Sequence, residues 1–304
     1  MSSNSGVLIA VMGPTGAGKT TLVNKLTGSN FKIGYGLESE TQQIQTATCA
    51  LNGESVHLID TPGFDDTDKT DTDILNLISN HLATSYRSGS RLTGVLYLHR
   101  ITDNRVGGVS YKNMKIFEKL CGDSAMASVT LCTTMWGQIP EHIGAQREAE
   151  LAANFWKGMI GKGATMRRVL DTQSSVTQVV SSLISLRRPV TLEVQREIVD
   201  QGKAVSETAA ARDLNREKEA LRLRMEAELE RTRQEARRQM EEQERRLREQ
   251  LEQQRRAHEA QLAREAEQRR REEENRRAER ARLERKAAEA RRRAKQSDDG
   301  CVIF

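Results

Sequence analysis

Residues Gly13-Pro-Thr-Gly-Ala-Gly-Lys-Thr20 fit the phosphate-binding pattern G-x-x-x-x-G-K-[ST]. An apolar run at residues 7–12 precedes the pattern and predicts a buried parallel strand, and residues 21–26 predict the first turns of a helix. In such a strand–loop–helix unit, backbone N–H groups and the helix N-terminus converge on phosphate oxygens. The stretch therefore predicts a nucleotide-binding loop.

Lys19 and Thr20 carry the chemistry predicted for this loop. The Lys19 ammonium would contact the β- and γ-phosphates of a nucleotide, and the Thr20 hydroxyl would coordinate Mg²⁺. The rest of the loop would surround the phosphates with backbone N–H groups. Nucleotide-binding residues are therefore expected at Gly13, Pro14, Thr15, Gly16, Ala17, Gly18, Lys19, Thr20 and Thr21.

A second motif follows at the end of a predicted hairpin. Residues 46–51 and 55–60 have the character of strands, and the turn Asn52-Gly53 between them is a strong hairpin signal. The second strand ends in Asp60-Thr-Pro-Gly63. A phosphate loop followed by D-x-x-G at a strand end is the arrangement of GTPases, in which Asp60 would hold Mg²⁺ and the Gly63 N–H would contact the γ-phosphate. The expected cofactors are GTP or GDP and Mg²⁺.

Strand and helix patterns alternate in the first part of the chain. Strands are predicted at residues 93–98, 128–134 and 166–170, and helices at residues 71–87, 113–120, 141–156 and 176–186. This order predicts an α/β P-loop NTPase domain whose mostly parallel sheet is flanked by helices, with the hairpin as an antiparallel edge. The ligand of such a sheet lies at the carboxyl ends of its strands.

Together the two motifs resemble those of the septin-related GTPases, the immune-associated nucleotide-binding (paraseptin) group of the TRAFAC class. The sequence is most similar to fungal "G domain-containing" P-loop proteins of that superfamily, which also resemble it at residues 97–105 and 192–199. The resemblance extends over residues 6–208 and implies a Mg²⁺-dependent switch. It implies that Thr41, or alternatively Thr46, closes on Mg²⁺ and the γ-phosphate, so that Lys19 and Thr41 would be the catalytic residues.

The base-reading motif departs from the GTPase pattern. Aligned by the resemblance, the [NT]-K-x-D motif corresponds to Thr134-Met-Trp-Gly137, so Gly137 stands where a carboxylate usually reads guanine. The loss of a buried hydrogen-bond partner weakens binding by about 1–3 kcal/mol. Whether the site prefers guanine or accepts any purine therefore stays open. Thr134 and Trp136 are still expected at the base, with Trp136 either a stacking wall or a core residue.

The hydrolytic machinery departs as well. Phe64 follows Gly63, where Ras-like enzymes carry a glutamine that positions the attacking water. Hydrolysis is therefore expected to be slow, or to be completed across a dimer of G domains.

Residues 204–296 predict a long helix, because they lack Pro and Gly and are dominated by strong helix formers. Apolar residues recur at eleven-residue steps at Leu229, Met240, Leu251 and Leu262. This period predicts a straight or slightly right-handed coiled coil, and a solitary charged helix is the alternative. The expected organisation is a G domain at residues 1–203, a helical stalk at 204–296 and a flexible tail at 297–304.

The last residues, Cys301-Val-Ile-Phe304, match a C-a-a-X prenylation signal. The basic residues 291–295 would add electrostatic attraction to a membrane surface. The chain carries 48 Lys and Arg against 43 Asp and Glu, and glutamates interleave its arginines, so nucleic-acid binding is not expected. No signal peptide or apolar span is recognised, which predicts a cytoplasmic protein that is peripheral on the cytosolic face of a membrane.

The expected function is a guanine-nucleotide-binding switch with slow GTP hydrolysis, tethered to a membrane through a prenylated Cys301. A homodimer is expected through the G domain, the coiled coil or both. The alternative is a catalytically degenerate nucleotide-binding scaffold whose coiled coil assembles partners.

Overall fold

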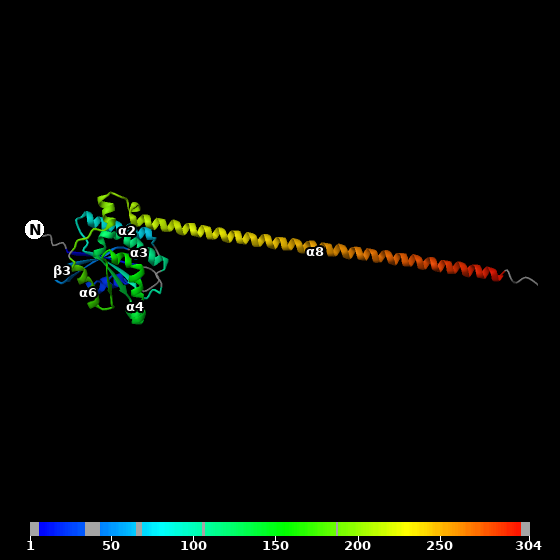
Figure 1. Ribbon diagram of the computed structural model, residues 1–304, viewed down its shortest axis with the longest axis horizontal. Coiled ribbons are helices and arrows are strands. Elements are labelled where there is room, and N and C mark those ends of the chain that lie inside the picture. The colour runs from blue at the N-terminus through cyan, green and yellow to red at the C-terminus, as the bar shows by residue number, and fades with distance from the viewer. Residues whose placement is uncertain (1–5, 34–42, 65–68, 105–106, 187, 299–304) are drawn as a thin grey trace, which may run out of the picture. The chain divides into compact units, whose positions relative to one another are not determined.

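The computed structural model describes residues 6–33, 43–64, 69–104, 107–186 and 188–298 (Figure 1). Its contacts divide the chain into two compact units, Met1–Arg222 and Leu223–Phe304. The predicted switch residue Thr41 and the predicted lipidation site Cys301 lie outside the described residues.

A six-stranded sheet forms the centre of the first unit, with the strand order β2-β3-β1-β4-β5-β6. The strands are β1 (Val7–Met12), β2 (Gln45–Leu51), β3 (Glu54–Asp60), β4 (Gly94–Arg100), β5 (Val129–Thr134) and β6 (Thr165–Arg168). Within this sheet the β2–β3 hairpin pairs antiparallel, and the other neighbouring strands pair parallel. The predicted mostly parallel α/β sheet with one antiparallel edge is therefore confirmed.

Helices cover both faces of this sheet (Figure 1). The helices are α1 (Lys19–Thr27), α2 (Asp71–Arg87), α3 (Gly108–Cys121), α4 (Glu141–Glu150), α5 (Lys157–Gly161), α6 (Gln173–Ile184), α7 (Glu193–Gln195) and α8 (Ala209–Asp298). Short 3₁₀ turns lie at Asp123–Ser128, Trp136–Gln138 and Val205–Glu207, and π-helical turns at Leu151–Phe155 and Arg196–Asp200. Successive strand residues point to opposite faces, so Ile9 and Val11 of β1 pack with α1 and α6, whereas Ala10 and Met12 pack with α2 and α3.

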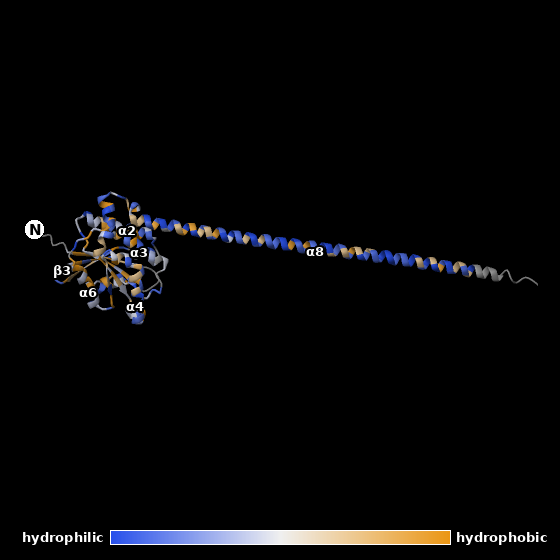
Figure 2. Ribbon diagram, in the orientation of Figure 1, coloured by the Kyte–Doolittle hydropathy of each residue, from blue (hydrophilic) through white to orange (hydrophobic). Residues whose placement is uncertain are grey.

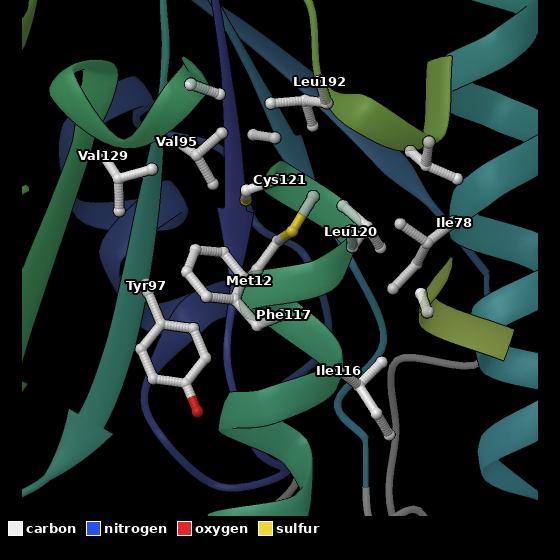
Figure 3. Close-up of a cluster of buried hydrophobic side chains, with 14 of the residues drawn as sticks. Met12, Ile78, Val95, Tyr97, Ile116, Phe117, Leu120, Cys121, Val129 and Leu192 are labelled. Atoms are coloured by element: carbon white, nitrogen blue, oxygen red, sulfur yellow. The ribbon is translucent and has the colours of Figure 1, made fainter. Parts of the chain in front are cut away.

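The larger core cluster lies between the sheet and helices α2 and α3. Figure 3 shows Met12 and Tyr97 of the sheet beside Phe117 and Leu120 of α3, with Ile78 of α2 on the far side. The ring centroids of Tyr97 and Phe117 are 4.4 Å apart, and both side chains are buried. This packing fixes the end of β1, where the predicted nucleotide-binding loop begins.

The helix expected over residues 141–156 is interrupted. Helix α4 ends at Glu150 and continues as the π-helical turn Leu151–Phe155. Its wider hydrogen bond runs from the Trp156 N–H to the Leu151 carbonyl at 2.7 Å, and both of these residues are buried. The wider turn thus brings two large side chains into the core.

Helix α8 begins in the first unit and supplies the described part of the second. Ala210, Ala211 and Leu214 at its start are buried in the core of the first unit. In the second unit, charged residues dominate with scattered apolar ones (Figure 2). Glutamate and arginine side chains four residues apart pair along this helix, with Glu242/Arg246, Glu244/Arg248 and Glu252/Arg256 at 2.5–2.6 Å. Among the described residues, no helix has both the length and the apolar character needed to cross a membrane.

Candidate nucleotide-binding site

The predicted phosphate loop joins β1 to α1 at the carboxyl edge of the sheet. Gly13 follows β1 with a φ of 141°, and a Cβ there would overlap with the carbonyl oxygen of Leu98 on β4. Gly18 has a φ of 88° and forms the N-cap of α1. The loop therefore needs glycine at both positions, and its helix starts at Lys19 as the motif requires.

The Lys19 ammonium lies inside this loop. Its Nζ donates hydrogen bonds to the carbonyl oxygens of Gly13 at 3.0 Å and Pro14 at 2.8 Å, and the side chain is buried. A buried ammonium on the inner side of a glycine-rich loop offers a positive charge where phosphate oxygens would lie.

Thr20 and Asp60 connect the phosphate loop to the end of β3. The Thr20 hydroxyl donates to Oδ2 of Asp60 at 2.7 Å, and the Asp60 side chain is fully buried. Oδ1 of Asp60 has no hydrogen-bond partner among the described residues. Burial raises the pKa of this carboxyl above its usual value, although the Thr20 hydrogen bond and the Lys19 charge act in the opposite direction.

A divalent cation fits this pair of side chains. Mg²⁺ takes one or two protein oxygens together with waters and nucleotide phosphates, rather than a cage of protein ligands. The described residues contain no cluster of three or more His, Cys, Asp or Glu side chains that would form such a cage. An orphaned carboxylate oxygen beside a threonine hydroxyl is a donor set that suits Mg²⁺ at a phosphate loop.

The D-x-x-G segment packs directly against the phosphate loop. The Thr15 N–H donates to the Phe64 carbonyl at 3.2 Å, and a Cβ at Gly63 would overlap with the backbone nitrogen of Thr15. The ring of Phe64 is buried in the core. Gly63 therefore lies beside the loop as predicted, and Phe64 has a packing role.

Thr46, the alternative to Thr41 as the switch residue, lies within β2. It pairs with Ile59 of β3 in the hairpin, and its side chain is exposed. Thr46 is thus held in a strand ladder.

A cavity of about 480 Å³ lies next to the phosphate loop, and Gly18 of that loop forms part of its lining. Helix α1 and the segment after it, the end of β5 and the β5–α4 connection, and the segment after β6 with the start of α6 line this cavity. The lining residues are Gly18, Thr21, Leu22, Lys25, Ile33, Thr134, Met135, Trp136, Gly137, Gln138, Val169, Leu170, Asp171 and Val176. It adjoins the phosphate loop at the carboxyl ends of the strands, which is where the base of a nucleotide is expected.

Thr134 and Trp136 brace this region from inside the protein. The Thr134 hydroxyl donates to the Ala17 carbonyl at 3.0 Å and thereby ties the β5 end to the phosphate loop. The Trp136 indole donates from Nε1 to Thr133, and the Arg168 guanidinium lies 3.9 Å from its ring centroid. A Cβ at Gly144 would come within 2.6 Å of the indole. Of the two roles considered for Trp136, these contacts support core packing.

Sequence reasoning missed Lys25 and Asp171, which line the same cavity. Lys25 Nζ donates to Oδ1 of Asp171, so the end of α1 is joined to the segment after β6. The signal that could have found them is position, because Asp171 follows the last predicted strand and therefore lies at the ligand edge of the sheet.

Comparisons with known proteins agree with this geometry. Residues 8–129 match the family described as "50S ribosome-binding GTPase". The chain is 42% identical over 88 residues to the small ribosomal subunit biogenesis GTPase RsgA of Mycoplasmopsis agalactiae. The aligned residues cover 27% of this chain and 28% of the relative. It is 38% identical over 63 residues to the tRNA modification GTPase MnmE of Azorhizobium caulinodans, 21% of this chain and 14% of the relative. The chain thus spans less than a third of the length of these curated relatives.

Solved structures share the fold. A dimerization-deficient mutant of Toc33 from Arabidopsis thaliana aligns with a TM-score of 0.52 at 15% identity, covering 61% of this chain and 87% of Toc33. Toc33 with GDP and Mg²⁺ aligns with a TM-score of 0.50 at 17% identity, covering 62% and 88%. Together with the phosphate loop and the D-x-x-G segment, these matches show that the first unit contains a P-loop GTPase domain.

Proposed function

We propose that this protein is a Mg²⁺-dependent guanine-nucleotide-binding switch with slow GTP hydrolysis. The observation that carries the proposal is the arrangement of Lys19, Thr20 and Asp60, which places a buried ammonium, a hydroxyl and an orphaned carboxylate oxygen around one loop. Binding of GTP or GDP with Mg²⁺ would give the orphaned Asp60 oxygen a partner and would bring phosphate oxygens to the Lys19 ammonium. Toc33, which shares this fold, has been solved with Mg²⁺ and either GMPPNP or GDP bound.

Each group has a defined task in this mechanism. The Lys19 ammonium would neutralise charge on the β- and γ-phosphates, and the loop N–H groups would orient them. Thr20 and Asp60 would hold Mg²⁺, which when bound neutralises charge on the phosphates. The Gly63 N–H, beside Thr15, would respond to the γ-phosphate, and Thr41 is proposed to close over it.

Slow hydrolysis follows from the position of Phe64. Its ring is buried in the core and carries no group that could orient a water molecule. A second G domain facing the nucleotide would supply the missing group. In the chloroplast translocon components atToc33 and psToc159, dimerization is important for the GTPase activity. That precedent supports a G-domain homodimer here.

The finer assignment to the septin-related group is also part of the proposal, and it rests on the motifs at residues 13–20 and 60–66. We further propose the domain division at residues 203 and 296, which separates the G domain from the helical stalk and the tail. The septin-related assignment and the domain division do not affect the phosphate chemistry.

A catalytically degenerate scaffold is the second candidate function. Two observations favour it: Gly137 stands where guanine is usually read, and Phe64 stands where water is usually positioned. In this alternative, nucleotide binding would be static or absent and the helix would assemble partners.

Nucleotide titration tests the binding on which the switch depends. The full chain should bind a fluorescent GTP analogue in the presence of Mg²⁺, and Lys19→Ala should weaken binding by roughly tenfold to a hundredfold because a charge-assisted contact is lost. Lys119→Ala, at an exposed position on α3, is the matched control and should bind as the wild type does. Failure of the wild type to bind GTP or ATP would favour the scaffold.

The Mg²⁺ dependence of binding should vary with pH through Asp60. Because the pKa of this carboxyl is raised, a proton should compete with Mg²⁺ as the pH falls toward that pKa, and the gain in GTP affinity from Mg²⁺ should shrink. Asp60→Asn should show little gain at any pH. Titrations with Mg²⁺ or with EDTA between about pH 5 and 7.5 measure this gain. The γ-phosphate of GTP also titrates in this range, and the Asp60→Asn variant shows how much of the pH dependence comes from it.

The control for this measurement is Asp123→Asn, which removes an exposed carboxylate that precedes β5 and pairs with Lys162. It should retain the full Mg²⁺ effect. An equal Mg²⁺ effect in wild type and Asp60→Asn would contradict the metal role of Asp60.

The apolar stripe of α8 supports a coiled-coil homodimer. Leu229, Met240, Leu251 and Leu262, which recur every eleven residues, are among the exposed large hydrophobic side chains of this helix, and Leu247 lies one turn before Leu251. Eleven residues make about three helical turns, so their repeat forms one stripe along the helix. We expect the nucleotide-free chain to sediment as a dimer of 34.2 kDa protomers, and Leu247→Lys with Leu251→Lys to sediment as a monomer.

Glu249→Lys with Gln253→Lys places two lysines on the opposite side of the helix and is the matched control. This control should remain dimeric. A wild-type monomer would indicate that the charged helix is solitary.

Membrane attachment through Cys301 and the basic residues 291–295 is a separate prediction. Cys301→Ser should move the protein from the membrane fraction to the cytosolic fraction of cells, because one prenyl chain and a basic patch act together as an anchor. Measurement is by cell fractionation. An unchanged distribution of the variant would refute prenylation as the anchor.

A further inference from the structure

The cavity beside Gly18 contains a single carboxylate among its described lining residues, that of Asp171. Gly137 lines the same cavity, and a Cβ built there has no neighbouring atom within 4 Å. The place from which a carboxylate usually reads guanine is therefore open space. If this cavity distinguishes guanine, another residue must supply the acceptor.

Asp171 lies on a segment that is fixed at both ends. The Val169 N–H donates to the Thr133 carbonyl at 2.8 Å and extends the β5–β6 ladder by one residue. The Leu170 N–H donates to the Ser175 hydroxyl at 3.0 Å, and Thr172 caps α6 through the Ser175 N–H. These bonds hold Asp171 at the mouth of the cavity.

Lys25 pairs with this carboxylate from the last turn of α1. Its ammonium donates to Oδ1 of Asp171, while the Asp171 side chain remains 89% exposed. An ammonium donor and an accessible carboxylate acceptor thus lie side by side in the cavity that adjoins the phosphate loop.

The Gln138 and Thr134 side chains of the cavity are engaged within the protein. The Gln138 amide nitrogen donates to the Met135 sulfur at 3.2 Å, and the Thr134 hydroxyl donates to the Ala17 carbonyl. The Lys25–Asp171 pair is therefore the charged feature best placed to meet a base.

The pair complements guanine and mismatches adenine. Guanine presents the O6 acceptor beside the N1–H and 2-amino donors, whereas adenine presents a 6-amino donor beside an unprotonated N1. A carboxylate accepts from two donors, and an ammonium donates to O6. We propose that Asp171 reads the guanine base in place of the residue missing at Gly137, with Lys25 holding the carboxylate and donating to O6. This inference rests on the proposed nucleotide-binding function.

The test is competition binding with the full chain, a fluorescent GTP analogue and Mg²⁺. GTP, ITP, XTP and ATP are the competitors, since ITP lacks the 2-amino group and XTP replaces it with an oxygen. We expect the wild type to bind GTP about tenfold or more tightly than ITP, as for loss of one hydrogen bond to a charged acceptor. The Asp171→Ala variant should lose this difference and bind GTP and ITP with equal affinity.

Asp171→Asn should reverse the preference and bind XTP more tightly than GTP, because its amide N–H donates to the 2-oxo group. A general loosening of the site cannot produce this reversal. Asp123→Asn, which removes another exposed carboxylate paired with a lysine, should keep the wild-type order.

Three results would overturn the inference while leaving phosphate binding intact. In the first, the wild type binds GTP, ITP and ATP alike, so no carboxylate reads the base. In the second, GTP is preferred but Asp171→Ala leaves the preference unchanged. In the third, both variants lose all four nucleotides equally, which would make Asp171 structural. A wild type that binds no nucleotide would instead overturn the proposed function itself.

Discussion

The hydrogen bond from the Thr20 hydroxyl to the buried Asp60 carboxylate is the contact on which the site depends. Parallel pairing of β1 with β3 places Val11 beside Asp60, so the carboxylate arrives at the base of the phosphate loop. A carboxylate in that position is costly to bury, and its second oxygen has no partner among the described residues. The fold therefore holds an acidic group in a place that a cation would stabilise, next to a loop that already holds an ammonium.

The intact geometry of the phosphate side contrasts with the altered base and water positions. Lys19, Thr20 and Asp60 form a connected set, whereas Phe64 is buried in the core and Gly137 leaves open space in the neighbouring cavity. Phosphate and metal binding depend on backbone geometry that tolerates few changes. Base reading depends on one carboxylate at the cavity edge, and a different strand end can supply it.

Local signals allowed much of the fold to be predicted. The glycine-rich loop, the Asn52-Gly53 turn and the helix at residues 71–87 are each marked in the sequence, and Thr70 and Asp73 form the capping box that starts α2. The π-helical turn at Leu151–Phe155 was missed because neither Gly nor Pro marks it. The Lys25–Asp171 pair was missed because its members lie 146 residues apart and only the folded sheet brings them together. The spacing of apolar residues in the sequence also could not show which way the Trp136 indole points.

The most direct test of the central claim is a crystal structure of the full chain with a non-hydrolysable GTP analogue and Mg²⁺. We expect Mg²⁺ at about 2.0–2.1 Å from the Thr20 hydroxyl oxygen, with Asp60 bound to it directly or through a water molecule. The Lys19 ammonium should lie within hydrogen-bond distance of the β- or γ-phosphate. Phosphates that bind away from Lys19, or a metal that binds without Thr20 and Asp60, would contradict the account.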